Sequence, residues 1–171
     1  ITPMIDAELL DRAVYPQLPE REKFIKQALT LLDENRSLLS QKKATIFFTL
    51  SGLRQFLNSG RVHEIPDEIY RPLTPDERKQ LITGMLPYCE KGIYRLLKYP
   101  LNQLTENLHL VVNHSMGYLL FQDIRGHILC FTFNEPSLLE AFLDYMQNLE
   151  NGYLYPCKDA AQLVRELLNE Y

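Results

Sequence analysis

Apolar residues recur every three or four positions along much of the chain, which is the spacing of helices that bury one face. The longest such stretch includes Phe24, Ala28 and Leu31 and is preceded by Pro19. Because proline suits the first turn of a helix, we expect this helix to begin at Pro19. The same spacing predicts further amphipathic helices at 5–13, 53–57, 138–146 and 160–168.

Flanking residues indicate where two other helices begin and end. Thr74-Pro75-Asp76-Glu77 has the composition of a capping box, with threonine ahead of the helix and glutamate at its third position. This helix is predicted to kink or end at Pro87, and residues 93–97 are predicted to form another short turn or helix. In the shorter helix before it, Ser51 is the predicted N-cap and Gly60 the predicted left-handed end.

Four short runs have the β-branched and aromatic composition of strands, and they lie near residues 44–50, 108–113, 118–124 and 127–133. Short glycine-containing segments separate the last three, which favours an antiparallel meander. Because the run at 127–133 is apolar on both faces, we expect it to be the more central strand. The predicted fold class is α+β, a single domain with a mixed or antiparallel sheet packed by amphipathic helices.

Length and charge narrow the classes of protein. A chain of 171 residues fits one domain with its own core, and we divide it into a lead-in or upstream-domain tail at 1–18 and a regulatory or effector domain at 19–171. With 18 Lys and Arg against 22 Asp and Glu, the net charge is −4, which disfavours direct binding of nucleic acid. The chain lacks a membrane-length apolar run and a secretion signal, so we expect a cytoplasmic protein that contacts no membrane.

Motifs that carry chemistry are few. The seven glycines are dispersed, so they form no phosphate-binding loop, and no GxSxG nucleophile elbow is present. Histidines and Asp123 raise the question of a metal site, but His109 and His114 are five residues apart and would face opposite sides of a regular strand. We therefore expect structural histidines, with no metal site, no catalytic residue and no cofactor.

Cys157 and the aromatic residues are the remaining candidates. Cys157 follows Pro156 at the predicted start of the last helix, where the helix dipole favours a thiolate, although we favour a capping or packing role. The 10 tyrosines and 8 phenylalanines suit a ligand pocket or a subunit interface. The candidate ligand-binding residues are polar or aromatic and lie on or beside the meander and the helix after it: His109, His114, Tyr118, Phe121, Asp123 and Tyr145.

Three segments of the chain resemble a known family: 46–53, 60–78 and 135–145. The first reads Ile46-Phe47-Phe48-Thr49-Leu50-Ser51-Gly52-Leu53, and the last contains Glu135-Pro136-Ser137 and Ala141-Phe142-Leu143-Asp144-Tyr145. They are similar to the C-terminal regulatory region of helix-turn-helix transcription regulators of the Cro/repressor type (the XRE family) in Firmicutes. In those proteins an N-terminal helix-turn-helix domain reads DNA, and the region after it dimerises or senses a signal.

The resemblance implies an effector-sensing or dimerising domain of a bacterial transcription regulator, and not an enzyme. We expect a homodimer, a small-molecule or protein effector, and DNA contact only through an upstream domain that is not part of this chain. An effector that binds one arrangement of the dimer better would then change the spacing of the attached DNA-binding domains. Two alternatives stay open: a small hydrolase-like enzyme with a pocket near His109, His114 and Asp123, and a protein-interaction module without a ligand.

Overall fold

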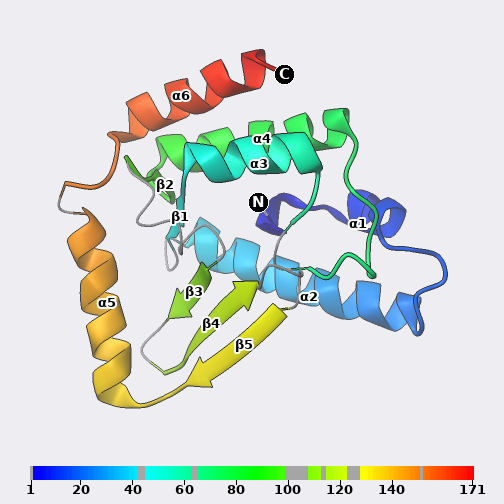
Figure 1. Ribbon diagram of the computed structural model, residues 1–171, viewed down its shortest axis with the longest axis horizontal. Coiled ribbons are helices and arrows are strands. Elements are labelled where there is room, and N and C mark those ends of the chain that lie inside the picture. Colours follow the sequence, from blue (N-terminus) through cyan, green and yellow to red (C-terminus); the bar gives the residue numbers. More distant parts are fainter. Residues whose placement is uncertain are drawn as a thin grey trace. The chain divides into compact units, whose positions relative to one another are not determined.

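The fold is α+β, as the sequence predicts, and it contains two small sheets (Figure 1). The computed structural model describes residues 2–41, 45–62, 65–98, 108–112, 115–122, 128–150 and 152–171. The chain forms two compact units. The first unit comprises Ile1–Leu97 and Tyr155–Tyr171, and the second unit, Lys98–Leu154, is inserted between them.

The first unit is mainly helical. A short 3₁₀ turn, η1 (Thr2–Met4), is followed by α1 (Ala7–Ala13) and the twenty-residue α2 (Arg21–Ser40). Helices α3 (Leu50–Ser59), α4 (Pro75–Glu90) and α6 (Cys157–Asn169) follow along the chain. The strands β1 (Ile46–Phe48) and β2 (Tyr94–Leu96) pair in parallel.

Several predicted helix boundaries are confirmed by their hydrogen bonds. Thr74 Oγ1 accepts from the Glu77 N–H and the Glu77 carboxylate accepts from the Thr74 N–H at 2.8 Å, which completes the capping box. Gly60 ends α3 with φ +68°, and a Cβ there would collide with the Leu73 carbonyl and the Arg78 guanidinium. The prediction that Ser51 caps this helix is wrong, because Thr49 Oγ1 accepts from the Gly52 N–H at 3.0 Å and α3 begins at Leu50.

Three further predictions about this unit are corrected. Helix α2 begins at Arg21 rather than Pro19, after Glu20 in a left-handed conformation with φ 51°. Helix α4 does not end at Pro87 but continues to Glu90, and the Lys91 N–H donates to the Pro87 carbonyl at 3.2 Å in the turn that follows. The segment 93–97, predicted as a short turn or helix, contains the strand β2 instead, and the run at 44–50 contributes β1 to this separate parallel pair rather than to the meander.

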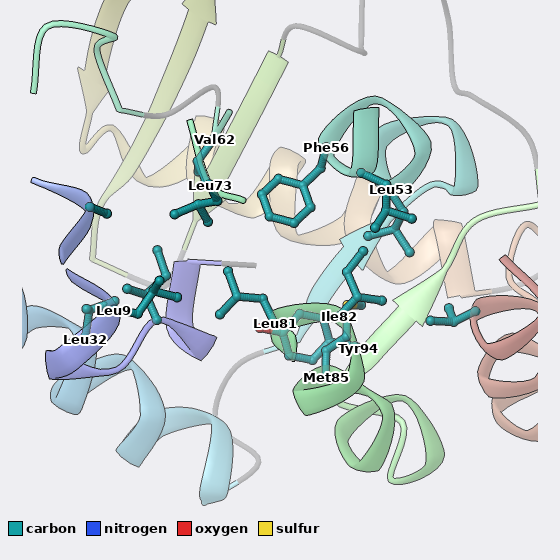
Figure 2. Close-up of a cluster of buried hydrophobic side chains, with 14 of the residues drawn as sticks. Leu9, Leu32, Leu53, Phe56, Val62, Leu73, Leu81, Ile82, Met85 and Tyr94 are labelled. Atoms are coloured by element: carbon teal, nitrogen blue, oxygen red, sulfur yellow. The ribbon is translucent and has the colours of Figure 1, made fainter. Parts of the chain in front are cut away.

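The core of the first unit lies between its helices and β2, as Figure 2 shows. The spacing along α4 places four apolar side chains on its buried face, those of Leu81, Ile82, Met85 and Cys89, and Ile82 and Met85 are at most 1% exposed. Leu53 and Phe56 of α3 meet them from one side, and Leu9 and Leu32 of α1 and α2 belong to the same cluster. Residues of the lead-in therefore contribute to this core.

Over its described residues, the second unit contains a three-stranded sheet and one helix. The strands β3 (Leu108–Val112), β4 (Gly117–Gln122) and β5 (Ile128–Phe133) form the predicted antiparallel meander, with β4 in the middle (Figure 1). Helix α5 (Pro136–Glu150) follows directly, and the Glu135 carboxylate caps it by accepting from the Leu138 N–H at 2.8 Å. The Lys98 N–H donates to the Tyr153 carbonyl at 2.7 Å, which joins the two ends of the unit.

The prediction that the 127–133 run forms the more central strand is wrong. The sheet order is β3-β4-β5, so β5 is the last strand over the described residues. Each connection joins two strands that are consecutive along the chain and adjacent in the sheet. A three-stranded meander of this kind places its first and third strands at the outside. Over the described part of the chain, a strand with the composition of a central strand therefore stands at the end of the sheet order.

Candidate functional site

Strand β5 carries one row of large apolar side chains toward one face of the second unit's sheet. The register pairs Leu129 with Phe121, Phe131 with Leu119, and Phe133 with Gly117. Because side chains alternate along a strand, positions 129, 131 and 133 share a face. The row is thus continuous along the strand.

Helix α5 contacts this row at Phe133, where the strand ends. The rings of Phe133 and Phe142 are 5.1 Å apart between centroids with planes tilted by 37°, so the helix packs on the sheet at this position. Phe133 also covers Gly117, where a Cβ would overlap its ring atoms. Glycine at this position allows the ring to lie flat across the neighbouring strand.

The other end of the row is open to solvent. Leu129 is 54% exposed and Phe131 is 56% exposed, although both are large and apolar. The sequence Ile128-Leu129-Cys130-Phe131-Thr132-Phe133 contains no charge and no proline. Edge strands normally carry a lysine, a proline or a bulge that discourages pairing with another chain, and β5 carries neither lysine nor proline. This end of β5 is the candidate site, and we call Leu129, Cys130, Phe131 and Thr132 the β5 surface.

Over the described residues, the predicted ligand-binding positions lie on both faces of the second unit's sheet and on α5. His109 pairs with Leu120 and Phe121 with Leu108, so positions 109 and 118 belong to one face of the sheet and position 121 to the other. Tyr118 is half-buried, and Tyr145 on α5 is 45% exposed. His114 and Asp123 lie outside the described residues. Over the part of the chain that is described, no three His, Cys, Asp or Glu side chains are placed to hold a metal ion.

Two of the hollows formed by the described residues lie in the first unit. One is an apolar cavity of about 20 Å³ lined by α1 and α2 residues and by Ile65, Ile69, Tyr70 and Leu73. It has room for about one water, and an apolar lining leaves such a cavity dry. The other is an open depression of about 270 Å³ at the start of α2, beside Glu20 and Lys23. Neither has the enclosed apolar volume of roughly 300 Å³ or more that is typical of a small-molecule pocket.

The cysteines lie in three different environments. Cys89 near the end of α4 is fully buried, and burial, followed by the nearby Cys157 and Glu90, raises the pKa of its thiol to about 12. Cys157 begins α6, as predicted, and its Sγ would lie 3.3 Å from a Cβ on Gly92. Cys130 on the β5 surface is exposed. A buried thiol with a raised pKa is a poor nucleophile, so Cys89 packs rather than reacts.

Glu77, a carboxylate with a strongly lowered pKa, has a structural role. Two hydrogen bonds of 2.8 Å join the Arg71 guanidinium to the Glu77 carboxylate, which is 9% exposed at the side chain. Bonding to Arg71 and to Thr74 lowers the pKa of Glu77 to about 2 against the opposing effect of burial. The same pairing raises the pKa of Arg71. Since the capping box and the ion pair use the acceptor sites of Glu77, this shift reflects structure and not proton transfer.

Comparison with protein-family models, curated proteins and solved structures finds no match. In the described residues, no helix is long and apolar enough to cross a bilayer. The sequence predictions missed Leu129 and Phe131 as site residues. Their signal was present in the apolar run at 127–133, but that run was assigned to the middle of the sheet.

Proposed function

We propose that this chain is the association region of a bacterial transcription regulator, the part that holds two copies of the regulator together. The observation that carries the proposal is the β5 surface, where Leu129 and Phe131 are more than half exposed on an edge strand without charge. Large exposed apolar side chains that cluster on one strand mark a site of protein contact. The resemblance to the region that follows the helix-turn-helix domain in Cro/repressor-type regulators supplies the biological setting.

The chemistry of the β5 surface suits a protein partner. Its side chains offer apolar area, and one way in which proteins associate is by adding a strand to the edge of a sheet. Fully burying a leucine or phenylalanine contributes roughly 1.5–3 kcal/mol each. A flat strand edge lacks the concave shape that encloses a small molecule.

A symmetric pair of these chains fits the role of a DNA-reading protein. Most homodimers have a two-fold axis, and dimeric helix-turn-helix proteins bind palindromic sites whose half-sites match that axis. Holding two copies together doubles the DNA contact, and the second DNA-binding domain then binds at a high effective concentration. In this proposal the DNA-binding domains contact DNA and the association region does not. The net charge of −4 is compatible with that arrangement.

The effector-sensing and enzyme hypotheses stay predictions. The enzyme pocket was predicted near His109, His114 and Asp123, and the candidate effector site adds Tyr118, Phe121 and Tyr145. No observation on the described residues favours either of them. The interaction-module hypothesis has one specific observation in its favour, the exposed row on β5. We therefore place association first.

The test is the mass of the full chain in solution, measured by light scattering during size-exclusion chromatography over a wide range of loading concentrations. We expect a mass of twice the 20.0 kDa chain that falls toward the single-chain value on dilution. A mass of one chain at every concentration would refute association of this chain with itself. The Leu129 variant argued in the Discussion then assigns the dimer to the β5 surface.

A further inference from the structure

We infer that the second unit is a separately folding insert, which opens and closes while the first unit stays folded. The insert is the segment Lys98–Leu154, and the rest of the chain forms the first unit on both sides of it. Proteins open in cooperative parts whose stabilities differ, and the least stable part opens first. The division of the core, the base of the insert and its packing all support this behaviour.

The core of the first unit is complete without the insert. Over the described residues, its main cluster of buried apolar side chains draws every member from Ile1–Leu97 and Tyr155–Tyr171. Leu139 and Leu149 of α5 are buried as well, at 3% and 5% exposure, but they do not belong to that cluster. Because residues that share a packed cluster unfold together, this separation predicts that the two units unfold separately.

The helix that follows the insert is built into the first unit. Val164 and Leu167 of α6 are at most 2% exposed and belong to the same buried cluster as Ile82 of α4. The Glu170 carboxylate also pairs with the Arg54 guanidinium of α3 at 2.8 Å. The parts of the first unit that precede and follow the insert are therefore held together by their own packing.

The chain enters and leaves the insert at neighbouring points. The Tyr155 N–H donates to the Leu96 carbonyl at 2.9 Å, and the Lys98 N–H donates to the Tyr153 carbonyl at 2.7 Å. The first of these bonds lies within the first unit, so it can persist when the insert unfolds. Holding the ends of an unfolded segment together costs an entropy that grows only slowly with its length. An open insert therefore does not force the first unit apart.

The insert is expected to be the less stable unit. It is the shorter of the two, and chains of about 60 residues bury a smaller fraction of their surface on folding than longer chains do. Leu129 of β5 is 54% exposed, whereas Ile82 and Met85 in the first unit are at most 1% exposed. Less apolar burial stabilises the insert, so we expect it to open at a lower denaturant concentration.

Separate opening would also regulate association, and this one step rests on the proposed function. The β5 surface belongs to the insert, so opening of the insert would remove that surface while α4 and α6 keep their packing. A partner that binds the folded insert would in turn stabilise it by mass action. Association and folding of the insert would then be coupled, and the first unit would not need to unfold.

Hydrogen exchange of the full chain in increasing urea, followed by mass spectrometry of its peptides, tests the inference. The lowest workable protein concentration is used, so that association contributes least. We expect peptides from β4, β5 and α5 to lose protection together, at a lower urea concentration than peptides from α4 and α6. This gives two steps, the first from the insert and the second from the first unit.

Two substitutions address the units one at a time. Gly117→Ala, whose new Cβ would overlap the Phe133 ring, should move only the first step to lower urea. If it unfolds the insert even without urea, peptides from α4 and α6 should still be protected. Glu77→Gln removes the carboxylate that pairs with Arg71 and should move only the second step.

The outcomes that overturn the inference are specific. They are a single step shared by all peptides, a shift of both steps by either substitution, or an earlier loss of protection in α4 and α6. A single-chain mass at every concentration would refute the proposed function and leave the separate opening of the insert standing. The two proposals therefore fail by different measurements.

Discussion

The ring of Phe133 lies across the backbone of Gly117, the residue it opposes in the β4–β5 pairing. A Cβ at Gly117 would overlap the ring, which also contacts Phe142 of α5 with centroids 5.1 Å apart. This single contact connects the middle strand, the edge strand and the helix of the second unit. Leu129 and Phe131, farther along the same row, are the part that stays more than half exposed.

The substitution Gly117→Ala is expected to destabilise the second unit by about 1–3 kcal/mol, because the ring must leave its position or the strands must separate. Urea unfolding followed by tyrosine fluorescence and circular dichroism would measure the change. The matched control is Gly84→Ala on α4, where the nearest atom to the new Cβ is Met4 Sδ at an ordinary 3.8 Å. That change should be neutral or stabilising by about 0.5–1 kcal/mol, because alanine is the better helix former. Equal stability of Gly117→Ala and the unmodified chain would contradict the packing argument.

The sequence predicts features that depend on neighbouring residues. The capping box at Thr74 and the left-handed end at Gly60 are decided by side chains within three or four positions, and both are confirmed. The meander at 108–133 is likewise decided by short turns between adjacent strands. Such features need no knowledge of distant parts of the chain.

Features that depend on distant partners were predicted wrongly. The apolar spacing at 93–97 suits a helix, yet Tyr94 and Leu96 form a strand because Ile46–Phe48 pairs with them from almost fifty residues earlier. The position of β5 at the edge depends on strand order, which residue composition does not encode. The candidate site depends on that order, so no local pattern distinguishes Leu129 at an edge from Leu129 in a core.

Glu77 predicts a dependence of stability on pH. Its pKa is about 2 in the folded chain against an ordinary 4.5, so the ion pair with Arg71 stabilises the fold fully above about pH 4.5. That stabilisation is lost as the pH falls from about 4.5 toward 2, because the folded chain must then take up the proton. Glu77→Gln should cost about 2 kcal/mol at neutral pH, since it leaves the Arg71 guanidinium without its bidentate partner.

Denaturant unfolding of both proteins between pH 7 and pH 2 checks this prediction, and the difference in unfolding free energy should shrink across the lower part of the range. Asp76→Asn is the control, because Asp76 is exposed in the same first turn and contributes only through the helix dipole, about 0.3–1 kcal/mol. A Glu77→Gln deficit that stayed constant down to pH 2 would show that the carboxylate's charge is not the stabilising feature.

The thiols should differ in their rates of modification. Cys130 is exposed, whereas Cys89 is fully buried with a thiol pKa raised to about 12, so little of it is thiolate at neutral pH. Under native conditions, at dilutions where the chain is single, we expect rapid labelling of Cys130 and protection of Cys89 until the first unit unfolds. Timed alkylation, digestion and mass spectrometry would report each site separately. Labelling of Cys89 as fast as Cys130 without denaturant would show that the packing of α4 against α6 opens readily.

The exposed row on β5 gives the most direct prediction about function. Leu129→Lys places a charge on the β5 surface, where association is proposed, and a charge on a strand of this kind discourages contact with another chain. We expect the dissociation constant of the dimer to rise at least about tenfold, which corresponds to about 1.4 kcal/mol, with little change in the stability of the single chain. Val111→Lys is the matched control, because Val111 is 46% exposed but belongs to β3 and to the opposite face. Sedimentation equilibrium measures both constants, and circular dichroism confirms that both variants fold. If the two substitutions weakened the dimer equally, or if only Val111→Lys did, the association surface would have to lie away from β5.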